Sequence, residues 1–183
     1  MRTSSKLAVL VLLGALIGGN AFGAAQAATS NLESTKLAKR FGIGFSAGGP
    51  LAVLGIVADV NITPNFSVGM GFGTGLDYNT FMASGRYYLL GEWVSPYVGL
   101  AVARWWSDGT NASKVSPTLL ADKFLGAGYD YTKGFSVFLL SPSLGVQFMH
   151  PMGFAISAEV SYLLRLMDMN NGTYAGLSAH WYF

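Results

Sequence analysis

The chain has 183 residues and no cysteine, and its charged residues make up 11%, against about 25% in an ordinary soluble domain. The length fits one domain, and the lack of cysteine excludes disulfides, thiol nucleophiles and zinc sites with cysteine ligands. Without the two basic residues of the leader described next, nine basic side chains balance nine acidic ones. A neutral chain offers no electrostatic surface for nucleic acid, so we expect no nucleic-acid partner.

The N-terminus has the pattern of a cleaved signal peptide. Two basic residues precede an apolar run at residues 7–17, and small residues follow it up to Ala27. This order of basic region, apolar region and small-residue cleavage site is typical of an export signal. A transmembrane anchor is the alternative, but the run is too short to cross roughly 30 Å of hydrocarbon. We predict residues 1–27 as a cleaved leader and residues 28–38 as a short periplasmic N-terminal segment.

The remaining residues, 39–183, alternate between large apolar and small or polar side chains. In residues 66–72, for example, four large apolar residues alternate with one serine and two glycines. A period of two indicates strands with two unlike faces. Prolines in turn-like contexts divide the region into four hairpin units, the third of which carries an insertion. We therefore predict eight strands, at 39–47, 51–62, 65–74, 79–90, 96–107, 133–149, 153–166 and 172–183.

These strands predict an all-β protein, an eight-stranded antiparallel up-and-down transmembrane β-barrel. A soluble lipocalin-like barrel is the alternative, but it needs an apolar interior, and glycine and serine cannot fill one. The pattern favours a barrel that is apolar outside and small or polar inside. Such a closed barrel satisfies its backbone groups without water. Aromatic residues near strand ends are expected to form girdles at the two membrane interfaces. They are Tyr87, Tyr88, Trp93 and Tyr97 near the proline turns, Trp181 and Phe183 at the C-terminus, and Trp105 and Trp106 toward the other end.

The leader, the eight strands, the short proline turns and the final Gly-Leu-Ser-Ala-His-Trp-Tyr-Phe resemble the small outer-membrane β-barrels of Gram-negative bacteria, the OmpA-barrel and OmpX-like group. Trp181 and the terminal Phe183 resemble the signal that such proteins present to the barrel assembly machinery. The resemblance implies an integral outer-membrane protein, porin-like in architecture, in contact with outer-membrane lipid. It does not choose among structural anchors, adhesion-related proteins, small-solute passages and lipid-modifying enzymes.

Charged side chains are predicted to gather inside the barrel. Successive residues of a strand point to opposite faces of the sheet, a rule called strand parity below. If Phe183 faces lipid, strand parity predicts a lumen charge network that consists of Arg40, Asp59, Arg86, Glu159, Arg165 and His180. Side chains can fill the interior of eight strands, and a lone buried charge is costly, so we expect Arg86 to pair with both acids. A structural network is the simpler interpretation, and a proton path, solute path or catalytic cluster is the alternative. For Arg104, the sequence leaves open whether the side chain faces the lumen or the lipid.

Signals for catalysis are weak. Ser178, His180 and Glu159 are the residue types of a hydrolytic triad, as in outer-membrane lipid A deacylases, but the flanking residues do not match that pattern. No set of His, Asp and Glu residues has the spacing of metal ligands. We expect no catalysis, no metal and no cofactor, and a structural or interaction role in the outer membrane. A narrow small-solute passage or a lipid-handling barrel is the alternative.

Residues 108–132 form the one long irregular segment, predicted as an extracellular loop. Residues 116–126 start with Ser-Pro and end with glycine, which predicts a short capped helix. Its apolar face would consist of Leu119, Leu120 and Phe124. That face would cover the barrel mouth, contact lipid or bind an extracellular partner whose identity the sequence does not give. The alternative is a plain loop that extends two strands.

Overall fold

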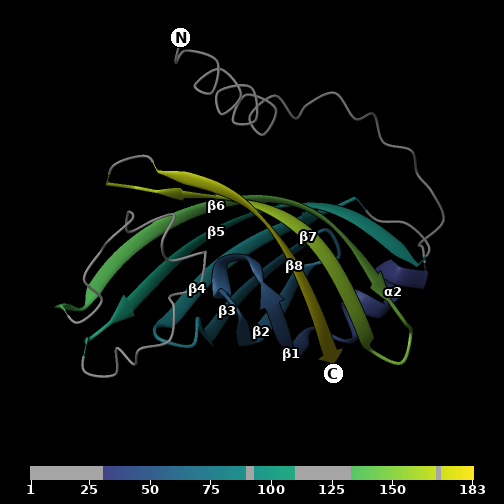
Figure 1. The fold of residues 1–183 in the computed structure, drawn as a ribbon. Helices are drawn as coiled ribbons and strands as arrows, with labels where there is room; N and C mark the ends of the chain where they lie inside the picture. Colours follow the sequence, from purple (N-terminus) through teal and green to yellow (C-terminus); the bar gives the residue numbers. More distant parts are fainter. Residues whose placement is uncertain (1–30, 90–92, 110–132, 168–169) are drawn as a thin grey trace, which may run out of the picture.

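The computed structural model describes residues 31–89, 93–109, 133–167 and 170–183, and eight strands in it close into one barrel (Figure 1). Each strand is antiparallel to the next in sequence, and β8 pairs with β1. This confirms the predicted all-β, eight-stranded up-and-down architecture. The strands are β1 (Phe41–Gly48), β2 (Leu54–Thr63), β3 (Phe66–Thr74), β4 (Asn79–Tyr88), β5 (Val94–Ser107), β6 (Phe135–Met149), β7 (Phe154–Arg165) and β8 (Asn171–Tyr182).

The two ends of the barrel differ. One end, called the turn end below, holds the C-terminus and the connections β2–β3, β4–β5 and β6–β7, and the helix α2 (Asn31–Ala38) lies there before β1. The other end, the loop end, holds the remaining connections. Among the described residues, no helix is both long and apolar enough to span a membrane. The leader 1–27, most of segment 108–132 and the predicted helix face (Leu119, Leu120, Phe124) lie outside the described residues.

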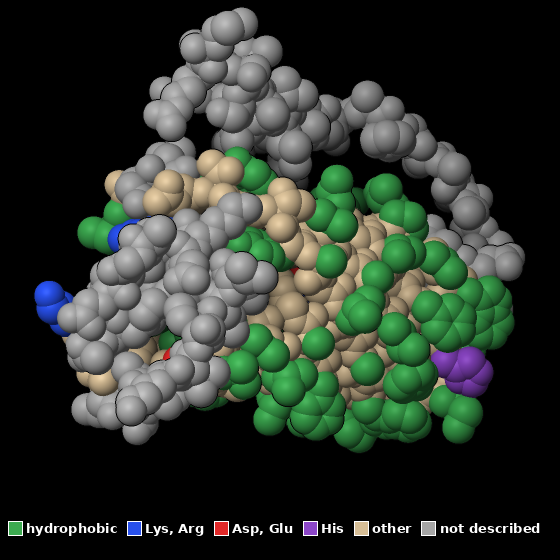
Figure 2. Space-filling view, viewed as in Figure 1, with side chains coloured by type: hydrophobic (Ala, Val, Ile, Leu, Met, Phe, Trp, Pro, Cys, Tyr) green, Lys and Arg blue, Asp and Glu red, His purple; other side chains and the backbone are tan. Residues whose placement is uncertain are grey.

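The outward face of the wall is apolar, as the alternation predicts. On β3, Phe66, Val68, Met70 and Phe72 are 38%, 38%, 60% and 56% exposed, while the serine and glycines between them face the lumen. Figure 2 shows hydrophobic side chains spread over the described outer surface of the barrel on the viewed face. An apolar exterior around a closed backbone is stable in hydrocarbon and unfavourable in water, so the wall is suited to a bilayer.

The lumen is apolar in its loop-end half, which differs from the small and polar interior that the sequence predicts. After β1 the chain turns into the barrel as a short 3₁₀ segment, η1 (Gly49–Leu51), and Leu51 is buried. The turn uses positive φ at Gly48 and Gly49, 82° and 64°, a backbone region that glycine enters without steric cost. The buried cluster around it consists of Leu51, Ala52, Val57, Tyr78, Met82, Ala101, Ala103, Trp105, Val137, Leu139 and Leu163.

Tyr88 and Tyr97 are buried in the lumen instead of lying in a girdle, at 1% and 3% exposed, and Trp105 corrects a third girdle assignment. Its side chain is fully buried in the lumen, and its indole N–H donates to the Pro50 carbonyl at 2.7 Å. Its ring also packs on Tyr78, with centroids 5.2 Å apart. Trp106, the next residue, points to the outer side and contacts Phe72 edge-on at 5.8 Å. The indole thus fastens the inward turn to the wall.

The glycines of β3 make room for that turn. A Cβ atom at Gly71 would lie 2.7 Å from a methyl carbon of Leu51, and one at Gly73 would lie 2.7 Å from the Leu51 carbonyl oxygen. Both distances are shorter than van der Waals contact, so bulkier residues would displace η1. The sequence suggests this glycine-rich strand as the likeliest place for a gap in the barrel. In the structure, the space beside it is occupied by Leu51.

Candidate functional site

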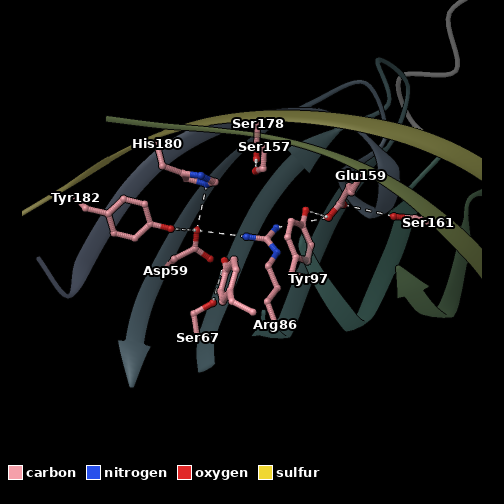
Figure 3. Close-up of polar contacts among 11 residues, drawn as sticks. Asp59, Ser67, Arg86, Tyr97, Ser157, Glu159, Ser161, Ser178, His180 and Tyr182 are labelled. Atoms are coloured by element: carbon pink, nitrogen blue, oxygen red, sulfur yellow. Dashed lines mark hydrogen bonds and ion pairs between the residues drawn. The ribbon is translucent and has the colours of Figure 1, made fainter. Parts of the chain in front are cut away.

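The turn-end half of the lumen holds a cluster of ionisable side chains centred on Arg86 of β4 (Figure 3). Arg86 Nη1 lies 3.6 Å from Asp59 Oδ2, and Nη2 lies 3.9 Å from Glu159 Oε2. Arg86 and Asp59 are 7% and 1% exposed. Since β4, β2 and β7 supply the three residues, the cluster ties distant parts of the wall together. Both acids lie within ion-pair reach of this arginine.

Asp59 has two further partners from the last strand. His180 Nε2 lies 3.1 Å from Asp59 Oδ2, and the Tyr182 hydroxyl donates to the same oxygen at 3.4 Å. His180 and Tyr182 point inward, while Trp181 and Phe183 are 44% and 62% exposed on the outer side. Because β8 closes the barrel against β1, these contacts join the first hairpin to the C-terminal strand.

Glu159 is held by a second set of donors. The Tyr97 hydroxyl donates to Oε2 at 2.8 Å, and the Ser161 hydroxyl donates to Oε1 at 3.3 Å. The Arg86 guanidinium also lies 5.5 Å from the centre of the Tyr97 ring. Hydrogen bonds to a carboxylate are stronger than those between neutral groups. The cluster therefore compensates its buried charges with several oriented donors.

Two of the predicted network members lie elsewhere. Arg40 is exposed before β1, and its Nε donates to the Leu37 carbonyl at 3.2 Å. Arg165 is half-buried at the loop end of β7, six residues beyond Glu159, or about 20 Å along the strand. Strand parity does not apply to Arg40, which precedes the strand. For Arg165, parity gives the face but not the depth.

The triad types do not form a catalytic chain. Ser178 Oγ lies 2.6 Å from Ser157 Oγ, so its hydrogen bond joins it to a second serine. His180 contacts Asp59 instead, and Glu159 contacts Tyr97 and Ser161. Figure 3 shows Ser178 and Ser157 facing each other, apart from the Asp59 contacts. Within the described residues, no group of three His, Asp or Glu side chains could hold a metal ion.

Sequence reasoning missed Lys36, which enters the lumen from α2. Its side chain is 1% exposed, and Nζ lies 2.9 Å from the centre of the Tyr88 ring, a cation–π contact. The amine has no hydrogen-bond partner among the described residues. Burial, and next the nearby Arg86 charge, lower the pKa of Lys36 to about 7. Strand parity says nothing about a residue outside the strands, so the sequence carried no signal for this position.

Lys36 predicts a pH dependence of folding. Its pKa is lowered from 10.5 to about 7 in the folded chain, so the unfolded chain binds more protons between these values. Stability should therefore rise with pH across this window, by at most about 1.4 kcal/mol per pH unit. We expect Lys36→Met to be more stable than the parent at pH 7 and this advantage to shrink toward pH 10. Unfolding titrations of both proteins at several pH values measure the difference. A constant difference would contradict the buried amine.

The space around the cluster is small. A hollow lined by Arg86, Glu159, Ser84, Pro50 and other lumen residues has a volume of only about 10 Å³, which is about the room that one water molecule needs. Two larger hollows, of about 800 and 530 Å³, are lined largely by outward-facing residues. This hollow beside the charge cluster thus leaves room for about one water molecule among the described residues.

The chain matches no protein-family model, and no curated protein sequence matches it. Among solved structures, it is similar to the N-terminal β-barrel domain of Pseudomonas aeruginosa OprF, with 16% identity, a TM-score of 0.58 and coverage of 79% of this chain and 98% of that one. It is also similar to the Yersinia pestis outer membrane protein Ail in a nanodisc, with 16% identity, a TM-score of 0.43 and coverage of 79% and 99%. The likeness to the OprF domain shows that the chain has the fold of that β-barrel domain.

Proposed function

We propose that this chain is an integral outer-membrane barrel with a structural or interaction role and no catalysis. The observation that carries this proposal is the closed lumen. At the loop end, η1 and the apolar cluster occupy the interior. At the turn end, the charges around Arg86 fill it, and α2 inserts Lys36 from below. A filled barrel leaves its ends and its outer wall as the surfaces that meet partners.

The location rests on the outer wall and on the last strand. A wall of exposed apolar side chains is suited to hydrocarbon, and the chain shares its fold with the N-terminal β-barrel domain of OprF. Trp181 near the end of β8 and Phe183 just after it both face outward, the arrangement expected of a signal for the barrel assembly machinery. The short turn end would face the periplasm and the loop end the exterior. A cleaved leader at residues 1–27 would supply the export that this location requires.

Planar-bilayer recording tests the closed lumen. The purified barrel, inserted into a lipid bilayer, is expected to show no steady conductance, because eight strands leave an interior that side chains fill. A large, steady conductance would contradict the proposal. Small or rare openings would instead support the alternative of a narrow solute passage.

One observation favours a second candidate, a lipid-handling barrel. The hollow of about 800 Å³ on the outer wall reaches Glu159, which lies between Gly145 and Gly176 on the neighbouring strands. A carboxylate behind so thin a wall lies close to acyl chains. Release of fatty acid from vesicle lipid by the parent barrel, abolished in Glu159→Gln, would favour this candidate. No release from any lipid tested would leave the non-catalytic role.

A further inference from the structure

Arg104 stands apart from the rest of the outer wall. Every other outward position on the eight described strands carries an uncharged side chain, whereas Arg104 of β5 is exposed there. Phe81 of β4 and Phe138 of β6 are its cross-strand neighbours. The sequence left its orientation open, and the structure places it outside the lumen. A charge on a wall that meets lipid is costly unless something satisfies it.

The guanidinium of Arg104 is held in place by its neighbours. Nε donates to the Ser136 hydroxyl at 3.1 Å. The guanidinium carbon lies 5.5 Å from the centre of the Trp106 ring and 5.7 Å from that of Phe138, which are cation–π distances. Within the described residues, no carboxylate lies within ion-pair distance of Arg104. Since a guanidinium has five N–H donors, the serine uses one and leaves the terminal nitrogens available for an outside acceptor.

The position of Arg104 along β5 is near the end of the strand, where we expect lipid headgroups to lie. The residue lies three positions before Ser107, the last residue of β5 at the loop end. Trp106 and Phe72, whose rings meet at 5.8 Å, lie beside it as an aromatic girdle would at a membrane interface. Arginine on a lipid-facing wall costs about 2–4 kcal/mol at the bilayer midplane and about 0–1 kcal/mol near the interface. From its place near the loop end of β5 and from the aromatic pair beside it, we infer that Arg104 lies close to the membrane interface.

We propose that Arg104 binds the phosphate of a lipid headgroup in the leaflet at the loop end. Ser136, Trp106 and Phe138 orient the guanidinium, and its terminal N–H groups donate to the phosphate oxygens, a geometry that favours arginine over lysine. The proposal rests on the proposed membrane location of the barrel. It is independent of whether the lumen conducts, so a conducting barrel that retains phosphorylated lipid would overturn the closed lumen alone.

The test measures the lipid retained by the folded barrel. The mature chain is inserted into phosphatidylcholine vesicles that carry a small fraction of lipid A, either phosphorylated or with its phosphates removed. Native mass spectrometry of the extracted barrel counts bound lipid. The variants are Arg104→Gln and Arg104→Lys, and the matched control is Arg40→Gln. Arg40 is also an exposed arginine, but it lies at the turn end and binds the Leu37 carbonyl.

We expect the parent and Arg40→Gln to retain phosphorylated lipid A equally, and Arg104→Gln to retain about tenfold less, as loss of a charged hydrogen bond implies. Arg104→Lys should lie between them, and lipid A without phosphates should be retained weakly by every variant. Equal retention by the parent and Arg104→Gln, or by both forms of lipid A, would overturn the proposal. If inorganic phosphate at the same concentration as the lipid displaces it, the site binds an adventitious ion only, and the proposal would also be overturned. If Arg104→Gln fails to fold, the lysine variant and the phosphate-free lipid decide.

Discussion

Replacing Arg86 with alanine is expected to lower the free energy of unfolding by about 3–5 kcal/mol, since loss of one partner leaves uncompensated buried charge. The substitution leaves the Asp59 carboxylate, which is 1% exposed, without its positively charged partner. It also removes the Arg86 contact of Glu159. Urea titration of the barrel in lipid vesicles, followed by tryptophan fluorescence, measures the change. An unfolding transition identical to that of the parent would contradict the ion pairs.

Two further variants distinguish the effect of an unpaired buried charge from the effect of losing any arginine side chain. Arg40→Ala removes an exposed arginine whose contact is a backbone carbonyl, and it should change stability by well under 1 kcal/mol, in the range usual for surface positions. The double variant Arg86→Met/Asp59→Asn removes the unpaired buried charge at Asp59, and it should regain part of the loss because a neutral amide replaces that carboxylate. If the double variant is less stable than Arg86→Ala, the unpaired Asp59 carboxylate is not the cause of the lowered free energy of unfolding.

Trp105→Ala is the second substitution with a large expected effect, a loss of about 3–5 kcal/mol as for other buried aromatic residues. It empties the centre of the apolar cluster and leaves the Pro50 carbonyl without its donor. The same urea titration measures it. Trp106→Ala is the matched control, because the next residue along β5 points outward and its loss should be clearly smaller. Equal losses for both tryptophans would contradict the inward turn.

Strand positions and the lumen acids could be predicted because both depend on local alternation. The period of two separates the faces, and the distance from the nearest turn gives the depth, which is enough to bring Asp59 and Glu159 near Arg86. The same reasoning failed for Arg40, because β1 begins at Phe41, two residues after the predicted start at residue 39, and Arg40 therefore precedes the strand. For Arg165, alternation gives the inward face, but its place at the loop end of β7 keeps it away from Arg86.

The filled interior could not be predicted in full because it depends on segments outside the strands. The sequence pattern predicts one strand over residues 51–62, whereas β2 begins at Leu54 and Leu51 belongs to the inward turn. The Gly-Gly-Pro run at residues 48–50 carries a turn signal, but nothing local shows that the turn points inward. Lys36 likewise reaches the lumen from a helix. Long-range packing decides both positions.

Chemical labelling of single cysteines tests the closed lumen most directly, since the chain contains no cysteine of its own. Ser141 is fully buried on the lumen side of β6, whereas Met152 is 65% exposed at the turn end and Asp108 is exposed at the loop end. In the folded barrel, a membrane-impermeant maleimide should label Met152→Cys and Asp108→Cys quickly and leave Ser141→Cys unlabelled until urea unfolds the chain. Labelling of Ser141→Cys in the folded barrel at the rate of the two controls would show an open lumen and contradict the account.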